Sequence, residues 1–268
     1  MNWKAILTGA TVLACSAALL AGCGSTEKAP STDNAAEMGK IIVGLDDNFP
    51  PMGFKDENNK IVGFDVDLAE EAAKRLGREV EFKAIDWSSK EAELKSGRVQ
   101  VLWNGLDITE KRKESMLFSK PYMDNHQIIF VKKGNTAVTD EKSLAGKTVG
   151  TQSAGTAEEY MDASDFYKKE VKEVKKYPDY VAAFMDLENG RLDAVIGDEI
   201  VGRYYMSKHP DTLDALDVVV GPVSEFGIAF AKDNTKLRDE VQKVLDEMKA
   251  DGTIAKISTK WFAKDITK

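Results

Sequence analysis

The sequence predicts an α/β protein of two successive units, each with a mostly parallel sheet flanked by helices. Short runs of β-branched and apolar residues alternate with amphipathic helical stretches, an order typical of parallel sheets. This alternation stops near residue 133 and then restarts. About 230 residues remain after the N-terminal segments, a length that suffices for two modest lobes.

In the first unit the predicted order is strand, helix, strand, helix, strand. The helix at 65–77 is the best marked, because Leu68, Ala72 and Leu76 recur at four-residue spacing and Gly77 ends it. Acidic residues stand early in this helix and basic residues late, as the helix dipole favours. The other elements predicted here are strands at 40–45, 79–85 and 99–103 and a short helix at 90–97.

A strand at 127–133 leads into the second unit, where the pattern restarts. The predicted strands are 147–151, 173–177, 192–197 and 224–232, and the predicted helices are 156–162, 179–190, 199–209 and 236–252. In open α/β sheets a ligand binds beyond the carboxyl ends of the strands. The segments that follow strands are therefore where we expect binding residues.

Residues 1–22 predict a lipoprotein signal peptide. A short basic start is followed by an apolar, small-residue stretch that closes on Gly22, directly before Cys23. The stretch is short for a membrane span and contains polar residues. Cys23 would carry the lipid, and the small polar residues of 23–39 predict a disordered tether. The mature chain would then have no free cysteine, which excludes disulfides and thiol chemistry.

The composition argues against several classes of function. The net charge of −8 does not suit a nucleic-acid binder, which needs a basic surface. His126 and His209 are the only histidines and are far apart in the chain. A histidine metal cluster or a Ser-His-Asp triad is thus not favoured, and we expect no cofactor and no metal.

Five segments that follow predicted strands hold residues with binding chemistry. Taken singly, each has an ordinary structural explanation, such as a proline-rich turn, a core aromatic or a helix cap. Phe49 and Trp87 offer flat apolar walls between which a side chain or a guanidinium can lie. The segments are 46–54, 86–89, 104–112, 151–159 and 197–199.

Taken together, these segments predict a site for a zwitterion. The planar guanidinium of Arg112 can bind a carboxylate with two parallel hydrogen bonds. The amides around Gly155 and Thr156, at a predicted helix start, offer further donors to the same anion. Asp198 supplies the opposite charge for an ammonium group. An amino acid fits this combination better than a phosphate does, because a phosphate has no use for Asp198.

The chain resembles the substrate-binding lipoproteins of ATP-driven polar amino-acid importers, which have the two-lobed type II periplasmic-binding-protein fold. The resemblance runs from about Lys40 to Phe262. It is carried by "VGLDDNFPPMGF", "NKIVGFDVDLAEEAAKRLG", "ITEKRKESMLFSKPY", "LAGKTVGTQSAGTAEEY", "NGRLDAV" and "ADGTIAKISTKWF".

The resemblance implies a role for each binding residue. Arg112 and Thr156 would hold the ligand carboxylate, and Asp198 with the Gly105 carbonyl would hold the α-ammonium. The side chain would lie between two aromatic rings and would meet Asp46 at its far end. The implied ligand set is Asp46, Phe49, Trp87, Asn104, Gly105, Asp107, Arg112, Gln152, Gly155, Thr156 and Asp198.

Two positions depart from the family pattern. Asp107 stands where the family usually has Ser or Thr, which removes a hydroxyl donor and adds a negative charge. Residues 154–156 read Ala-Gly-Thr in place of the frequent Gly-Thr-Thr. With Asp46, Asp107 and Asp198 in one cleft, a cationic ligand such as arginine, lysine, ornithine or histidine is favoured. Glutamine and cystine remain alternatives, as does an Asp107 that faces protein.

The resemblance also implies how the protein works. Lobe 1 would comprise 40–126 plus 225–268 and lobe 2 would comprise 127–224. Two hinge strands would let the lobes close over the ligand. The protein would be a monomer, lipid-anchored outside the cytoplasm, that delivers its ligand to a membrane permease.

Two other functions are possible on this scaffold. The first is an enzyme such as a cyclohexadienyl dehydratase, which needs a general acid with a raised pKa, and Glu91, Glu158 or Asp107 could serve. The spacing singles out none of these three. The second is a sensory module that signals through a partner protein.

Overall fold

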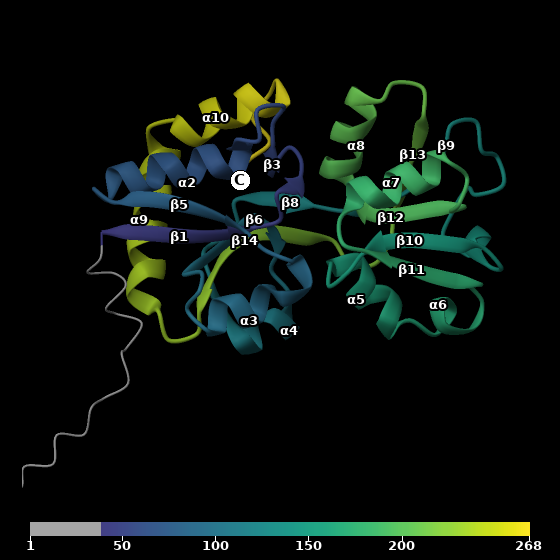
Figure 1. Cartoon of the computed structure of the whole chain (residues 1–268), viewed down its shortest axis with the longest axis horizontal. Coiled ribbons are helices and arrows are strands. Elements are labelled where there is room, and N and C mark those ends of the chain that lie inside the picture. Colours follow the sequence, from purple (N-terminus) through teal and green to yellow (C-terminus); the bar gives the residue numbers. More distant parts are fainter. Residues whose placement is uncertain (1–38) are drawn as a thin grey trace, which may run out of the picture. The chain divides into compact units, whose positions relative to one another are not determined.

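The computed structural model describes residues 39–268 (Figure 1). The predicted signal peptide, Cys23 and the tether up to residue 38 lie outside the described residues. The predicted α/β class is confirmed, with helices against both faces of two sheets. Within residues 39–268 no helix is long and apolar enough to cross a membrane.

The strands are β1 (Lys40–Leu45), β2 (Asn48–Phe49), β3 (Gly53–Lys55), β4 (Ile61–Val62), β5 (Glu79–Ala84), β6 (Val101–Asp107), β7 (Met116–Phe118), β8 (Met123–Asn125), β9 (Gln127–Lys132), β10 (Thr148–Gln152), β11 (Glu173–Tyr177), β12 (Ala194–Asp198), β13 (Leu213–Val219) and β14 (Ser224–Ala231). The helices are α2 (Phe64–Arg75), α3 (Lys90–Lys95), α4 (Glu110–Ser115), α5 (Thr156–Ala163), α6 (Asp165–Lys169), α7 (Tyr180–Glu188), α8 (Glu199–Lys208), α9 (Thr235–Ala250) and α10 (Thr253–Phe262), with short 3₁₀ turns η1 (Trp87–Ser89) and η2 (Lys142–Leu144).

The first sheet has the strand order β5-β1-β6-β14-β7, and β8 also pairs with β14. β1, β5 and β6 are parallel, whereas β14 is antiparallel to β6, β7 and β8. Apolar side chains of α2, α9 and α10 pack on one face, and those of η1 and α3 pack on the other. We call this sheet and its helices, α4 included, lobe 1.

The second sheet has the order β11-β10-β12-β9-β13. β10, β11 and β12 are parallel, and β9 is antiparallel to both of its neighbours. α7 and α8 cover one face, and α5 and α6 cover the other. We call this sheet and its helices lobe 2. In both sheets, one strand thus runs against the rest.

The chain passes between the sheets at two neighbouring places. β8 ends at Asn125 and β9 starts at Gln127, so only His126 separates a strand of the first sheet from one of the second. The return runs from β13 to β14, whose first residue, Ser224, is paired with Asn125. The His126 carbonyl also accepts a hydrogen bond of 2.9 Å from the Glu199 amide of α8.

Three segments predicted as loops are wrong in part, because strands extend into them. Beyond the predicted strands, residues 104–107 belong to β6, residue 152 to β10 and residue 198 to β12. Pairing with antiparallel strands explains two of these extensions, since Asp107 pairs with Phe226 and Asp198 with Gln127. Polar side chains mark the end of the apolar run, but they do not stop backbone pairing.

The largest apolar cluster is continuous between the two lobes. Phe49, at the end of β2, lies 6.1 Å from Tyr180 of α7, measured between ring centroids. β2 belongs to a small antiparallel sheet with β3 and β4, which follows β1 in the chain. This small sheet carries an aromatic side chain of lobe 1 into contact with lobe 2.

Candidate functional site

Arg112 is positioned by the turn between β6 and α4. The Thr109 side chain caps α4 by accepting a hydrogen bond of 3.2 Å from the Arg112 amide. Arg112 is the third residue of the helix, and its side chain is only 2% exposed. A charged side chain this deeply buried requires partners of opposite polarity.

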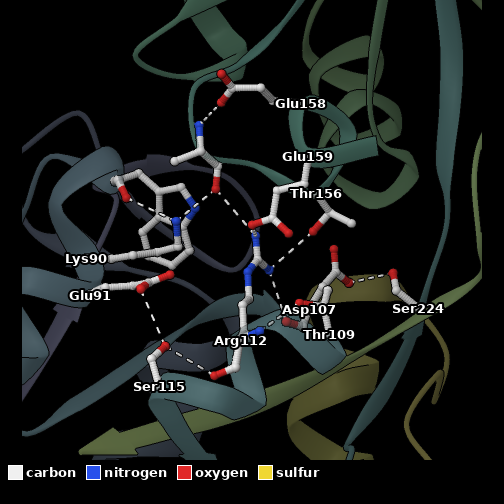
Figure 2. A network of polar contacts seen from close by, with 12 residues as sticks. Lys90, Glu91, Asp107, Thr109, Arg112, Ser115, Thr156, Glu158, Glu159 and Ser224 are labelled. Carbon is white, nitrogen blue, oxygen red and sulfur yellow. Dashed lines mark hydrogen bonds and ion pairs between the residues drawn. The ribbon is translucent and has the colours of Figure 1, made fainter. Parts of the chain in front are cut away.

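The Arg112 guanidinium joins the two lobes (Figure 2). Its NH1 donates to the Asp107 carbonyl at 3.0 Å and to Thr156 Oγ1 at 3.2 Å. Its NH2 donates to Glu159 Oε1 at 3.1 Å and to the Ala154 carbonyl at 3.4 Å. Its Nε is buried and makes no hydrogen bond to any described residue. Thr156 and Glu159 lie in the first turn of α5, and Ala154 lies in the turn directly before this helix.

The start of α5 has fewer free amides than the sequence predicts. The Gly155 amide donates to the Gln152 carbonyl at 3.3 Å, and the Ala154 amide donates to the Glu158 side chain. The Gly155 amide thus closes this turn, and the use of the amides around Gly155 and Thr156 for an anion stays a prediction. The Ala154 carbonyl instead faces lobe 1, where Lys90 Nζ donates to it at 2.8 Å.

Asp198 and Asp107 share their hydrogen-bond donors. Asn125 Nδ2 donates to Asp107 Oδ1 at 3.0 Å and also to Asp198. Gln127 Nε2 lies 2.8 Å from Asp198 Oδ1 and 3.4 Å from Asp107 Oδ2. Ser224 Oγ donates to Asp107 Oδ1 at 2.6 Å. Asp107 thus accepts hydrogen bonds from three protein side chains.

Burial raises the pKa of both aspartates above the ordinary range. For Asp198 the negative charge of Asp107 is the second cause. The side chains that donate to these two buried acids are all neutral. A cation bound here would offset the negative charge of the acids, so the region favours a cation. The backbone carbonyl of Asp107 also contacts Arg112, so the guanidinium and the acid pair are adjacent.

Asp46, directly after β1, forms a second polar cluster. Its amide donates to Asn104 Oδ1 at 3.0 Å, and its carboxylate accepts from the Asn48 amide at 2.9 Å and from Gln152 Nε2 at 2.7 Å. Burial raises the pKa of Asp46 to about 7, and the charge of Asp179 adds to this shift. Asn104 Nδ2 is buried and has no hydrogen-bond partner among the described residues.

The two predicted aromatic walls differ in what they contact. Phe49 packs against Tyr180, whose buried hydroxyl makes no hydrogen bond to a described residue. Trp87 is buried in lobe 1, and the Lys90 ammonium lies 5.2 Å from its ring centroid. Burial lowers the pKa of Lys90 to about 8, and the neighbouring charge of Arg112 adds to this effect. One face of Trp87 is thus already covered by a cation.

Gly105 lies in β6 with a φ of +54°, a conformation that favours glycine. Its amide donates to Asp65 Oδ2 at 2.7 Å. A Cβ atom here would lie 2.8 Å from the Phe49 ring and 3.3 Å from Phe226. The position therefore requires glycine both for its backbone and for the approach of Phe49.

Hydrogen bonds bring seven of the predicted residues into two clusters. Arg112, Thr156, Asp107 and Asp198 form one, and Asp46, Asn104 and Gln152 form the other. Several residues of these clusters were not predicted from the sequence. They are Lys90, Asn125, Gln127, Glu159 and Tyr180, together with Asp65 behind Gly105.

For Asn125 and Gln127 the sequence does hold a signal, because these two polar residues flank His126 directly before an apolar run.

Within residues 39–268 no group of three or more His, Cys, Asp or Glu side chains is arranged to hold a metal ion. The described residues supply charge and hydrogen bonds, with a buried guanidinium near buried carboxylates.

The chain is similar to known amino-acid-binding proteins. The chain is 34% identical over 238 residues to the L-cystine-binding protein TcyJ of Escherichia coli (strain K12), covering 87% of this chain and 86% of that protein. It is 34% identical over 234 residues to the ABC transporter arginine-binding protein 1 of the same strain, covering 86% and 94%.

Solved structures are similar too. An ancestral arginine-binding protein bound to arginine is 41% identical, with a TM-score of 0.79, and the match covers 84% of this chain and 98% of that one. A substrate-binding protein of an ABC uptake transporter from Streptococcus pneumoniae, with bound histidine, is 30% identical, with a TM-score of 0.83 and coverage of 88% and 97%. A family model matches residues 41–264. The chain belongs to the bacterial extracellular solute-binding proteins, family 3.

Proposed function

We propose that this protein binds a free α-amino acid as the substrate-binding component of an ABC importer. The observation that carries the proposal is the buried Arg112 guanidinium, whose Nε has no described partner, adjacent to the acid pair Asp107 and Asp198. A carboxylate satisfies the guanidinium, and an ammonium satisfies the acids. An α-amino acid carries both groups on one carbon atom.

The charge of the surroundings favours a cationic amino acid. Asp46, Asp107, Asp198 and Glu159 contribute four carboxyl groups, of which only Glu159 forms an ion pair with a basic side chain of the site. A cationic side chain would replace the neutral Gln152 amide on Asp46 with a stronger, charge-assisted hydrogen bond. Relatives named for arginine, cystine and histidine, and a related structure with bound glutamine, define the competing ligands.

We further propose that the two lobes, 40–126 plus 225–268 and 127–224, close over the ligand. Support comes from the two chain crossings at His126 and before Ser224, the places where φ and ψ changes would rotate one sheet against the other. The ligand would stabilise the closed form through contacts to both lobes. A permease would then recognise this closed form.

The family places the protein outside the cytoplasm. We propose that Cys23 carries a lipid that anchors a monomer to the cell membrane. Replacing Cys23 by serine should release the protein from the membrane fraction and abolish incorporation of labelled fatty acid. A Cys15→Ser variant is the matched control, because it keeps the proposed lipid site.

Calorimetric titration with the twenty amino acids, ornithine and cystine tests the proposed function. We expect binding to arginine, lysine, ornithine or histidine to be strongest. If the protein binds none of the titrated amino acids, the proposal is overturned. Incubation of the same protein with a cyclohexadienyl acid checks the dehydratase alternative, for which we expect no turnover.

A further inference from the structure

Lys90 is a buried cation whose hydrogen-bond partners are all neutral. It is the first residue of α3, and it is only 2% exposed. Its Nζ donates to the Ala154 carbonyl of lobe 2 at 2.8 Å and to the Trp87 carbonyl at 3.4 Å. Within residues 39–268 it forms no ion pair with an acidic side chain. Burying an ammonium group costs free energy unless an opposite charge compensates it.

Arg112 brings a second cation to the same oxygen atom. Its NH2 donates to the Ala154 carbonyl at 3.4 Å, so the ammonium of Lys90 and the guanidinium of Arg112 lie next to one another (Figure 2). Burial lowers the pKa of Lys90 to about 8, and repulsion by Arg112 adds to this effect. Two like charges that share one neutral acceptor in a buried place favour the binding of an anion.

The acidic residues around this pair do not cancel its charge. Glu159 forms an ion pair with Arg112 at 3.1 Å. Glu158 pairs instead with Lys176 and accepts a hydrogen bond from the Ala154 amide. Glu91, which follows Lys90 in α3, is exposed to solvent. Only one acid therefore contacts the two cations, and one positive charge remains uncompensated.

We infer that Lys90 is a specificity-determining residue, whose charge favours ligands with a free carboxylate. Arg112 makes the hydrogen bonds to that carboxylate, and Lys90 adds electrostatic attraction beside it, which is strong where water is excluded. The carboxylate in turn compensates the buried ammonium. This inference rests on the proposed function, in which Arg112 binds the carboxylate, and it adds a second residue to that recognition.

Calorimetric titration of Lys90→Met with two compounds tests the role of the charge. The variant deletes the ammonium and keeps an apolar stem beside Trp87. Argininamide differs from arginine in that a neutral amide replaces the carboxylate. We expect Lys90→Met to bind arginine about tenfold more weakly than the unmodified protein, and to bind argininamide at least as tightly.

Lys95→Met is the matched control, because Lys95 ends the same helix and is exposed. It should bind both compounds as the unmodified protein does. If Lys90→Met loses affinity equally for arginine and argininamide, or loses none for arginine, the inference is overturned.

A second variant separates the charge of Lys90 from its hydrogen bond between the lobes. Lys90→Gln keeps an N–H donor for the Ala154 carbonyl but carries no charge. It should lose as much arginine affinity as Lys90→Met does. Full arginine affinity in Lys90→Gln would overturn the inference and assign the effect to the hydrogen bond. This comparison requires arginine alone, so it decides the question even where argininamide binds too weakly to be measured.

Urea unfolding distinguishes lost recognition from lost stability. Deleting a buried ammonium that has no acidic partner should not lower the free energy of unfolding, so affinity should decrease while stability is kept. If the unmodified protein binds no amino acid, the proposed function fails and this inference fails with it. If the unmodified protein binds arginine and Lys90→Met binds it equally well, only the inference fails.

Discussion

Asp46 and Gln152 stand 106 positions apart in the chain, and the Gln152 amide donates a hydrogen bond of 2.7 Å to the Asp46 carboxylate. Asp46 directly follows β1 and Gln152 ends β10, and each of these strands is parallel to both of its neighbours. The carboxyl ends of two parallel sheets therefore meet at this contact. This is the region in which open α/β sheets bind ligands.

The first prediction concerns selectivity for charge. Asp46→Asn should weaken arginine binding by about tenfold to a hundredfold, since a hydrogen bond to a charged group contributes about 1.5–3 kcal/mol. Glutamine binding should change by less than about threefold, because a neutral amide can still pair with asparagine. Calorimetric titration with both ligands measures the two changes.

Asp47→Asn is the control for Asp46→Asn. Asp47 is adjacent in the chain and pairs with Lys55 near the surface, so the same charge is lost outside the two polar clusters. Its binding of arginine should stay as in the unmodified protein. Equal losses for arginine and glutamine in Asp46→Asn would show that Asp46 does not distinguish charge.

The second prediction is a pH dependence of arginine binding. Burial raises the pKa of Asp46 to about 7, so this carboxyl is largely protonated at pH 6. A cationic ligand needs the ionised form, and binding must therefore release a proton below pH 7. Arginine should bind about tenfold more weakly at pH 6 than at pH 8. Titration in buffers of different ionisation enthalpy measures the proton release.

Asp46→Asn removes the carboxyl group that releases this proton, so arginine affinity should change less between pH 6 and pH 8. Asp107 and Asp198 also have raised pKa values, and their titration should account for the pH dependence of arginine affinity that remains in the variant. An identical pH profile in the unmodified protein and in Asp46→Asn would assign the proton to that acid pair instead.

The third prediction concerns the geometry of Arg112. Arg112→Lys keeps the charge but loses the planar fork, so a carboxylate can no longer bind with two parallel hydrogen bonds. We expect arginine affinity to decrease at least about a hundredfold, roughly 2.7 kcal/mol. Arg98→Lys is the control, since Arg98 forms a comparable double contact with Glu93 on the surface. A small change in Arg112→Lys would contradict bidentate binding.

The sequence predicted the residues of the site that have a chemical signature. Asp198 and Asp46 each combine a charge with a place at or directly after the end of a strand, and Arg112 is a charged residue in the helix that follows β6. Glu159 had no such signature. An acidic residue in the first turn of a helix is common, because it suits the dipole, and only the packing of α5 against α4 makes it a partner of Arg112.

Asp107 shows a similar limit. The sequence placed it in a loop near the ligand, whereas β6 extends through it and pairs it with Phe226. Its three side-chain donors come from Asn125, Gln127 and Ser224, which lie 18 to 117 positions away in the chain. No local pattern shows that such distant residues meet.

The fold was predicted where periodicity was strong. The helix predicted at 65–77 is α2, and the four-residue spacing of its apolar side chains matches its packing on the first sheet. β7, β8 and β13 were not predicted, because pairing with β14 and β9 defines them more than their own residues do. Local sequence patterns also do not show that β14 and β9 run antiparallel to the other strands of their sheets.

The last prediction tests the close approach at Gly105. Gly105→Ala should cost about 1–2 kcal/mol for its positive φ and about 1–3 kcal/mol more for the clash of Cβ with the Phe49 ring. Gly97→Ala separates the two terms, since Gly97 also has a positive φ but no atom within 4 Å of its Cβ position. Urea unfolding of both variants measures the free energy of unfolding.

Binding should follow the same order as stability. A Cβ at Gly105 displaces Phe49, and Phe49 contacts Tyr180 of lobe 2, so the variant alters both the aromatic wall and the contact between the lobes. Gly105→Ala should therefore lower arginine affinity, whereas Gly97→Ala should leave it unchanged. Equal losses of stability in the two variants, with equal affinities, would mean that Phe49 moves aside freely and does not define the site.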